Sequence, residues 1–590
     1  MTTRRAFLRS AAALGAAYAT PLTYAQAARA RGGETVAGAA ALEREAAAFA
    51  NPLRLPGASG LYGVLRVGDL RELRVARTEI EVLPGKRTPF LAYIAEAGGK
   101  QFLNPALLAK RSEELRVRMV NELQEPTIIH WHGLTNDARN DGNGLYVAEP
   151  GKAYEYAFKL QDDRASMYFY HPHPTGYIPG QVYGGLASVL FLEDEEETTL
   201  RRELDLALGE TEIPLVLQDR TFDAQGRIEY KPSREAAFQG FIGKRLLVNL
   251  TDQPYLTAAR RIYRFRVLNG ANARTYRLAF LQNGRKLGYY LAGTDGGLLG
   301  SAQRVSETFI SPGQRLDILL DLREAQEGAV TLATLAFDPM HAEGEQEETE
   351  KEPKAAMDQS MPGMDEGKIG GKKGSSGAMA GMEMAGKKAS AGAMAGMEVE
   401  GKKASGGAMA GMEMEGDEGE PRALLRIDVK SSPSYAKKIP ATLSRLPVPR
   451  ESKNLRPIKL AQDGKGGWTI NDRLYDAKAN VFTVQRGAAE TWVIENERNS
   501  MPHPMHLHGF QFRILERRGS PQQVRALAGA RGLLPQDLGL IDTVLVWPRE
   551  SVRIALDFSY PHPGDQDYVF HCHNLEHAEV GMMLRYGVRA

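Results

Sequence analysis

Cysteine is nearly absent from this chain of 590 residues, which contains only Cys572. A lone cysteine cannot form a disulfide within the chain, so cysteine usage does not identify the compartment. An excess charge of one sign is also lacking, with 74 Lys and Arg residues against 73 Asp and Glu residues. This balance argues against nucleic acid or an anionic membrane surface as the main partner.

Long hydrophobic runs are missing as well. Beyond the N-terminal region no stretch reaches the roughly 20 apolar residues of a membrane span, so we expect no span and a soluble mature protein. Arg4 and Arg5 before an alanine-rich run, with Ala25-Gln26-Ala27 for cleavage, are typical of a twin-arginine signal over residues 1–27. An ordinary basic signal is the alternative. Either predicts an exported protein, and the twin-arginine signal predicts the periplasm and the twin-arginine export machinery as a partner.

Long helical periodicity is scarce, and most of residues 50–340 consists of short alternating runs between Gly, Pro and Asn. Residues 115–120 and 263–267 are examples. Alternation of this kind is the pattern of half-buried strands. Many short strands with few helices predict an all-β chain of β-sandwiches, and the length predicts roughly three to four domains.

Residues 341–420 break the pattern, because they lack aromatic residues and are rich in Gly, Ala, Met, Lys and Glu. A motif that starts at Gly377 recurs at Gly392 and at Gly407. Such a composition cannot bury enough apolar surface to offset its ordering entropy, so we predict a disordered insertion. Proline-rich residues 433–455 predict an interdomain linker.

Ten of the twelve histidines fall into four short clusters. They are His130 and His132; His171 and His173; His503, His506 and His508; and His571, His573 and His577, with Cys572 inside the last cluster and Met582 after it. Crowded imidazoles with one thiolate and one thioether are ligands that suit copper. A single His-x-His pair carries little weight, but structural use does not explain four clusters in one chain.

The strand parity around Cys572 sorts these ligands into two groups. Side chains alternate across a strand, so His571 and His573 face one way and Cys572 the other. On the cysteine side, His503, His577 and the weak axial ligand Met582 would complete a blue-copper electron-transfer centre. The other eight imidazoles are enough for three copper ions.

One strand can therefore link the two groups of ligands. An electron that arrives at Cys572 can pass along the backbone to either flanking histidine, and dioxygen on the other side can collect four electrons and leave as water. A nitrite reductase would leave most of these imidazoles unused. His341, which could be a ligand or a solvated loop residue, and His562, which is typical of a turn, stay outside this scheme.

With these motifs, the chain resembles the three-domain multicopper oxidases of the bacterial laccase and cuprous-oxidase type. The resemblance covers nearly all of the mature chain outside the insertion. It implies three consecutive cupredoxin-like Greek-key β-sandwiches, which we expect at residues 50–197, 205–432 (with the insertion) and 456–590. It also implies an exported oxidase that acts on dioxygen, and we expect a monomer.

The resemblance further implies four copper ions per chain and a role for each ligand. His130 and His506 would hold the type 2 copper; His132, His171 and His573 one type 3 copper; His173, His508 and His571 the other; and His503, Cys572, His577 and Met582 the type 1 copper.

Two carboxylates are candidates for proton supply. Asp141, eleven residues after His130, matches an acidic position near the type 2 copper of similar enzymes, although Asp141-Gly142 is also a turn dipeptide. Many bacterial members carry Glu directly after the type 1 histidine, whereas this chain has Ala578 and then Glu579. Which carboxylate delivers protons therefore stays open.

Thioethers suit Cu(I), and eleven methionines lie between Met357 and Met414. In copper-efflux oxidases, which this segment resembles, such segments shield the type 1 site and bring Cu(I) to it. We therefore expect oxidation of cuprous ion and phenolic compounds, with a role in copper tolerance. A dedicated laccase, a copper-sequestering protein and a plain spacer role for the segment are the alternatives.

Overall fold

The computed structural model describes residues 34–160, 164–340, 417–431, 434–448, 450–465, 467–559 and 562–590. The expected signal at residues 1–27, His341 and most of the methionine-rich segment lie outside the described residues. Residues 115–120 and 263–267 lie in strands β8(Glu114–Asn121) and β17(Ile262–Asn269), as predicted. Strand β8 has the predicted alternation of exposed and buried residues, whereas every residue of β17 is buried. Among the described residues, no helix is long and apolar enough to cross a membrane.

The first sandwich pairs two sheets. Their strand orders are β10(Ala153–Lys159)-β8(Glu114–Asn121)-β4(Glu72–Glu81)-β5(Arg87–Ala97)-β6(Lys100–Leu103)-β2(Gly60–Leu61) and β3(Val64–Arg66)-β7(Ala106–Lys110)-β12(Ser188–Glu193)-β11(Ser166–Pro172)-β9(Ile129–His132). Val75 and Val117 of one sheet and Trp131 and Leu190 of the other belong to one buried core.

The middle sandwich is built the same way around a core that includes Phe265, Ile318, Val330 and Ile427. Its sheets are β1(Asn51–Pro52)-β16(Pro254–Ala259)-β25(Arg422–Lys430)-β24(Gly328–Thr334)-β18(Tyr276–Gln282)-β19(Arg285–Leu287), with β22(Thr308–Ile310) on β18, and β15(Thr251–Asp252)-β14(Arg245–Val248)-β13(Glu212–Arg220)-β17(Ile262–Asn269)-β23(Arg315–Asp321)-β20(Tyr289–Thr294)-β21(Gly297–Val305).

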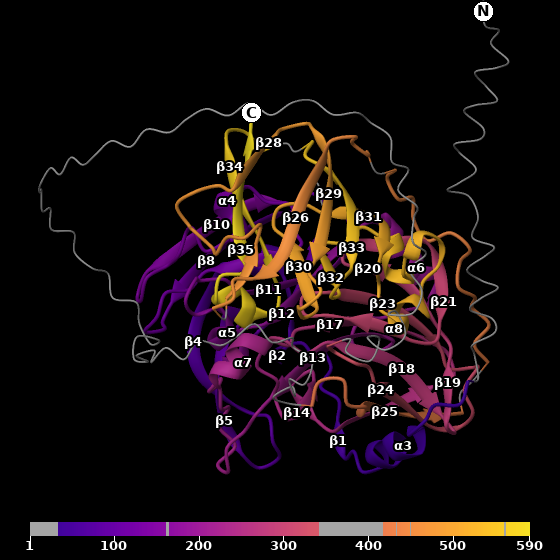
Figure 1. Cartoon of the computed structure of the whole chain (residues 1–590). Helices are drawn as coiled ribbons and strands as arrows, with labels where there is room; N and C mark the ends of the chain where they lie inside the picture. The colour runs from indigo at the N-terminus through magenta and orange to yellow at the C-terminus, as the bar shows by residue number, and fades with distance from the viewer. Residues whose placement is uncertain are drawn as a thin grey trace, which may run out of the picture. The chain divides into compact units, whose positions relative to one another are not determined.

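The third sandwich carries the C-terminal histidines. Its sheets are β27(Trp468–Ile470)-β26(Leu455–Gln462)-β29(Ala489–Asn496)-β33(Ser551–Asp557)-β31(Phe512–Arg518) and β28(Phe482–Gln485)-β35(Met583–Arg589)-β34(Gln566–Cys572)-β30(His503–Leu507)-β32(Thr543–Val546). Figure 1 shows β34 and β35 in yellow, side by side. Cys572 and Met582 lie in the core of this sandwich with Trp492 and Phe570.

The described helices are short. They are α3(Ala39–Ala47), α4(Ala138–Asp141), α5(Ile178–Gly184), α6(Glu195–Leu204), α7(Arg234–Gln239), α8(Gln522–Arg525) and α9(Leu575–Glu579), with single 3₁₀ turns η2(Val67–Asp69), η5(Ala530–Gly532) and η6(Pro535–Leu538). Together with the six sheets they give the all-β architecture that the alternating runs predicted.

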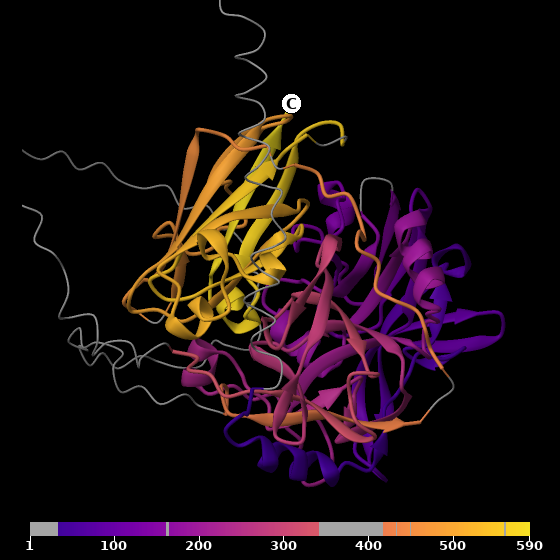
Figure 2. The same ribbon diagram turned by 90° about the vertical axis from the view of Figure 1, so that its right-hand side faces the viewer.

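The first described residues pack on the middle sandwich and not on the first sandwich, which follows them in the sequence. We expected residues 50 onward in the first sandwich, but β1 pairs with β16 of the middle one. Helix α3 packs there as well, since Leu42 shares a cluster with Leu281, and Ala46 with Ala423. Figure 2 shows this indigo helix below the orange strand β25. The physical reason is a pairing across about two hundred residues, which local sequence patterns do not reveal.

Candidate metal centres

Two antiparallel strands of the third sandwich bring most of the C-terminal histidines together. Strand β30 pairs with β34 in a register that sets Met505 opposite Cys572 and His506 opposite His571. Because neighbours along β34 face opposite ways, its end supplies Cys572 to one cluster and His571 to another. We call these the thiol cluster (His503, Cys572 and His577) and the imidazole cluster (the eight other histidines of the four motifs).

The thiol cluster is fully buried. Cys572 Sγ lies 3.6 Å from His503 Nδ1 and 3.6 Å from His577 Nδ1, and the two Nδ1 atoms are 3.2 Å apart. The far nitrogens contact polar side chains: His503 Nε2 lies 3.0 Å from Ser500 Oγ, and His577 Nε2 3.1 Å from Asn574 Nδ2. These contacts orient both Nδ1 atoms toward the sulfur.

The chemistry of the thiol cluster fits a copper ion. Burial raises the pKa of the Cys572 thiol well above its usual range, so a bound cation is needed to hold the thiolate form. Met582 is tied into the same turn, because its N–H donates to His577 O at 2.9 Å and its carbonyl accepts from Cys572 N at 3.0 Å. Two imidazoles and one thiolate form a donor set that suits copper electron transfer.

Two aromatic side chains cover the thiol cluster. The Trp468 ring packs against His503 at 4.8 Å and His577 at 5.2 Å, between ring centroids. Phe238 of helix α7 stacks on Trp468 at 4.7 Å, and Trp468 Nε1 donates to Phe238 O at 2.8 Å. Phe238 is half-buried, whereas Trp468 is fully buried. Sequence reasoning missed both residues, since neither lies near a motif.

The imidazole cluster joins two sandwiches. Strands β9 and β11 bring His130, His132 and His171, and β30 and β34 bring His506 and His571. The other three, His173, His508 and His573, directly follow β11, β30 and β34. His130 Nε2 lies 3.3 Å from His506 Nε2, while His571 Nε2 lies 3.2 Å from His173 Nε2 and 3.1 Å from His508 Nε2. Two nitrogens that share a tetrahedral ion at about 2.0 Å lie roughly 3.3 Å apart, so these spacings fit shared metal ions.

A third group within the imidazole cluster is marked by unpartnered nitrogens. His132, His171 and His573 have ligand atoms within 4.8 Å of one another. The buried atoms His132 Nδ1, His171 Nε2 and His573 Nε2 have no hydrogen-bond partner among the described residues. Burial also holds the pKa of each of these three imidazoles well below its usual range. Neutral rings with free lone pairs are what a metal ion requires.

Asp141 lies inside the imidazole cluster. Its Oδ2 is 2.9 Å from His508 Nδ1, and its backbone carbonyl is 2.7 Å from His130 Nδ1. Its carboxyl group is fully buried, and that burial raises its pKa well above the usual range. The Asp141-Gly142 dipeptide does form a turn, at the end of helix α4, but the carboxylate of that turn points toward the histidines.

Asp542 is a second carboxylate of the imidazole cluster. Its Oδ1 lies 2.9 Å from His132 Nε2, and its carbonyl lies 3.0 Å from His506 Nδ1. Thr543 Oγ1 donates to Asp542 Oδ1 at 2.9 Å. Sequence reasoning missed Asp542, because it stands 29 residues from the nearest histidine motif, which begins at His571, and the Asp-Thr pair has no distinctive spacing.

The remaining candidates, Glu579 and His562, lie apart from the thiol cluster and the imidazole cluster. Glu579 of α9 is mostly buried, and its Oε2 has no hydrogen-bond partner among the described residues. Its carboxylate faces the backbone of Gly176 and Ile178, and burial raises its pKa to about 7. His562 is half-buried, with Nε2 3.4 Å from Thr135 O.

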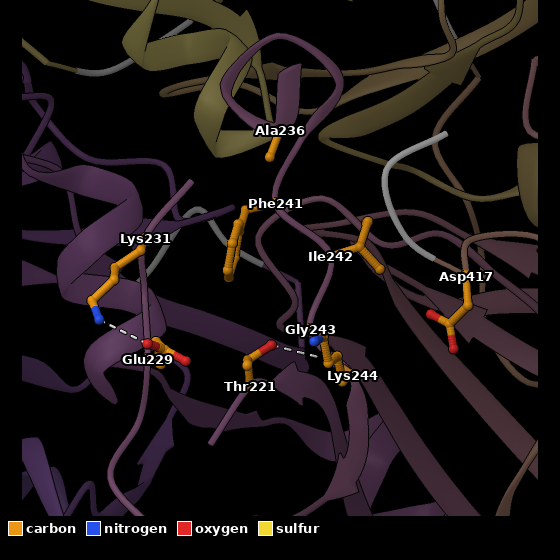
Figure 3. Close-up of a pocket in the computed structure, with 9 residues that line it drawn as sticks. All are labelled: Thr221, Glu229, Lys231, Ala236, Phe241, Ile242, Gly243, Lys244 and Asp417. Carbon is orange, nitrogen blue, oxygen red and sulfur yellow. Dashed lines mark hydrogen bonds and ion pairs between the residues drawn. The ribbon is translucent and has the colours of Figure 1, made fainter. Parts of the chain in front are cut away.

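A pocket of about 530 Å³ lies beside the segment that follows α7 (Figure 3). Thr221, Glu229, Lys231, Ala236, Phe241, Ile242, Gly243, Lys244 and Asp417 line it. The Phe241 ring is 5.1 Å from the Tyr230 ring, and the Tyr230 hydroxyl donates to Glu576, the neighbour of His577. None of the lining residues is a methionine, cysteine or histidine, so the pocket offers no soft ligand for Cu(I).

Comparison with known proteins agrees with this geometry. Two family models, each described as multicopper oxidase, match residues 87–197 and 448–590. The chain is 26% identical over 485 residues to "Multicopper oxidase mco" of Staphylococcus haemolyticus, covering 82% of this chain and 81% of the relative. It is 26% identical to a laccase of Bacillus subtilis, covering 82% of this chain and 88% of that one.

A solved structure gives the stronger match. The McoA multicopper oxidase of Aquifex aeolicus has a TM-score of 0.71 and 32% sequence identity, covering 92% of this chain and 99% of that one. The chain therefore belongs to the multicopper oxidase family and is an oxidoreductase that uses copper.

Proposed function

We propose that the protein couples one-electron oxidation of cuprous ion and phenolic compounds to the four-electron reduction of dioxygen to water, in a role in copper tolerance. One observation carries the proposal: the end of β34 supplies both the only cysteine and the clustered imidazole of His571, and the residue that follows the strand, His573, supplies another. Bound copper would supply the redox chemistry, as one type 1 ion at the thiol cluster and one type 2 and two type 3 ions at the imidazole cluster.

The protein's own part is to hold the donors and to connect the clusters. The backbone of β34 joins Cys572 directly to His571 and His573. His571 Nδ1 also lies 2.8 Å from the Cys572 carbonyl, which adds a hydrogen-bonded contact beside the covalent path. Short covalent and hydrogen-bonded links favour passage of single electrons between the clusters. The thiol cluster itself is closed to water by Trp468 and Phe238.

Reduction of dioxygen to water consumes four protons, so a carboxyl group near the imidazole cluster is needed to deliver them. We propose Asp141 for it, because its carboxylate contacts His508 and lies 3.6 Å from His130 Nδ1. Glu579 is the second candidate, since it lies two residues after the type 1 histidine His577, and Ala578 fills the position directly after that histidine. Both proposals rest on position in the fold.

Oxygen uptake tests the function. With Cu(I) or a simple phenol as reductant, the purified holoenzyme should consume one dioxygen for every four electrons supplied and release no hydrogen peroxide. If the enzyme takes up no oxygen with either reductant, the alternative of a copper-sequestering protein is supported instead. Uptake with phenols alone would indicate a dedicated laccase.

The methionine-rich segment is our candidate for Cu(I) capture, on the evidence of its eleven thioethers. Deletion of residues 357–416 should raise phenol turnover and lower cuprous oxidation. A matched replacement of the methionines by leucine keeps the length of the segment and removes only the sulfur. If neither rate changes in either variant, the segment is a spacer.

The pocket of Figure 3 favours an organic reductant as a further substrate. Its half-buried Phe241 offers an aromatic surface, and Lys244 offers a cation for an acidic substituent. Phe241→Ala should raise the KM for phenols and leave cuprous oxidation unchanged. Equal KM values in the variant and the wild type would exclude the pocket as the docking place.

We also propose export through the twin-arginine pathway as a monomer to the periplasm. The support is the Arg4-Arg5 motif and the following apolar run. Replacing both arginines by lysine should retain the protein in the cytoplasm, as fractionation would show. Gel filtration with light scattering checks the monomer.

A further inference from the structure

The middle sandwich reaches the imidazole cluster although it contributes none of the histidines. Gly313 precedes β23 with φ of 83°, a left-handed conformation that favours glycine. A Cβ atom at this position would lie 2.9 Å from His132 Cε1 and 2.9 Å from His573 Cγ. The backbone at Gly313 therefore packs directly against one imidazole from the first sandwich and one from the third.

Arg315, two residues further on, uses its whole guanidinium group at this junction. Nη1 and Nη2 donate to Asp542 Oδ1 at 2.8 Å and Oδ2 at 2.6 Å. The other donors point at backbone carbonyls: Nε to Met167 at 3.2 Å, Nη1 to Gly313 at 3.0 Å and Nη2 to Asp295 at 3.1 Å. All five N–H groups of the buried guanidinium are satisfied, across all three sandwiches.

Asp295, also from the middle sandwich, binds the backbone N–H groups of Arg315, Asp542 and Thr543. Its Oδ1 accepts from Arg315 N at 2.7 Å, and its Oδ2 accepts from Asp542 N at 3.1 Å and Thr543 N at 3.3 Å. The Asp542 side chain and main chain are thus both fixed by the middle sandwich.

Asp542 passes this constraint to two imidazoles. His132 Nε2 contacts Asp542 Oδ1, which leaves His132 Nδ1 without a hydrogen-bond partner among the described residues and therefore available to a metal ion. His506 Nδ1 contacts the Asp542 carbonyl, which leaves His506 Nε2 facing His130. Carboxylates that bond the far nitrogen of a ligating histidine fix its tautomer and orientation.

We propose that Arg315, supported by Asp295, is a positioning residue through which the middle sandwich orients His132 and His506 for metal binding at the imidazole cluster. The inference rests on the copper at that cluster and not on the identity of the reductant. A lysine cannot replace the arginine, because a single ammonium group cannot make the planar two-point contact with Asp542. The alternative is a buried ion pair that contributes to folding alone.

Arg517 offers a matched control. It is buried in the third sandwich, where it also makes a two-point contact, with Nε 2.7 Å and Nη2 3.0 Å from the Asp537 carboxylate oxygens. Its other partners are Glu550 and the Leu545 carbonyl, and none of these partners is a clustered histidine. Loss of either arginine leaves a buried carboxylate without its partner, so both losses should lower Tm.

The test compares Arg315→Met, Arg315→Lys and Arg517→Met as copper-loaded full chains. Copper content is measured after dialysis against a graded chelator, together with the type 2 copper signal in electron paramagnetic resonance. Arg315→Met should keep the type 1 absorption band and lose about tenfold or more in copper affinity at the imidazole cluster. Arg315→Lys should recover only part of that affinity, and Arg517→Met should keep copper content and the resonance signal unchanged.

Equal copper retention and identical resonance signals in Arg315→Met and Arg517→Met would overturn the proposal. Should Arg315→Met fail to fold, Asp295→Asn keeps the shape of the site and replaces one acceptor oxygen by a donor. It should weaken copper retention at the imidazole cluster without loss of the type 1 band, and unchanged retention would likewise overturn the proposal. Because copper content is read without turnover, an enzyme that proved inactive toward Cu(I) and phenols would leave this result intact.

Discussion

The thiol cluster and the imidazole cluster meet at one strand but depend on the fold in different ways. The thiol cluster draws its three groups from residues 503–577 of a single sandwich. The imidazole cluster draws its histidines from the first and third sandwiches, and Asp295 and Arg315 of the middle sandwich hold the Asp542 carboxylate beside it. The first is therefore a property of one domain, and the second is a property of how three domains pack.

The side chains that surround the two clusters also differ. Aromatic rings of Trp468 and Phe238 cover the thiol cluster, which suits a site that passes single electrons and excludes water. Asp141 and Asp542 touch the imidazole cluster, which suits a site where charge and protons accumulate. A substitution at one cluster should therefore leave the spectroscopic signals of the other cluster measurable.

The largest effect is expected from Cys572→Ser. Serine removes the only thiolate, so the intense blue band should disappear and oxidase turnover should fall to background. The imidazole cluster should stay loaded, with its type 2 resonance signal unchanged, because Cys572 faces away from it. Absorption and resonance spectra of the same sample check both statements, and loss of the two signals together would contradict the separation of the clusters.

Asp141→Ala is expected to come next. It removes the carboxyl group that contacts His508, and oxygen reduction should slow by about 10²-fold, the usual size of a lost proton-transfer group. Anaerobic reduction of the blue band by substrate should keep its wild-type rate. Stopped-flow absorption separates the two steps.

Asp137→Ala is the matched control for Asp141. Asp137 caps the same helix α4, and its carboxylate accepts from the N–H groups of Arg139 and Asn140 and not from a clustered histidine. Its loss should cost about 1 kcal/mol of stability and leave oxygen reduction unchanged. Equal slowing in the two variants would assign the effect to the helix and not to the carboxyl group of Asp141.

A smaller effect is expected from Phe238→Ala, which opens the cover of the thiol cluster. Bulky phenols should reduce the type 1 copper several-fold faster, because the half-buried ring no longer blocks approach to Trp468. Phe482→Ala is the control, since Phe482 packs on Trp492 of the same sandwich at 5.4 Å. Faster reduction in both variants would point to general loosening of the sandwich.

The smallest effect concerns stability and leaves both clusters intact. Burial raises the pKa of Glu418 from 4.5 to about 7, and its Oε1 accepts from Thr275 N at 2.7 Å. The folded state then binds a proton more tightly, so stability falls as pH rises from about 4.5 to about 7. Glu418→Gln should remove this pH dependence, which amounts to about 3 kcal/mol of stability over that range. Urea unfolding across this pH range checks it, with exposed Glu420→Gln as a control that keeps the slope.

The sequence predicted what depends on local pattern. Alternation predicted strands such as β8 and β17, and strand parity placed Cys572 opposite His571 and His573. It could not predict Trp468, Phe238, Asp542, Asp295 or Arg315, because each acts through contacts between elements more than a hundred residues apart or outside any motif. The pairing of β1 with β16 escaped prediction for the same reason.

Anomalous X-ray scattering at the copper edge, from crystals of the loaded enzyme, tests the central claim most directly. The account predicts four copper peaks per chain, one beside Cys572 Sγ and three among the eight imidazoles of the four motifs. A single peak, or copper bound away from these side chains, would contradict it.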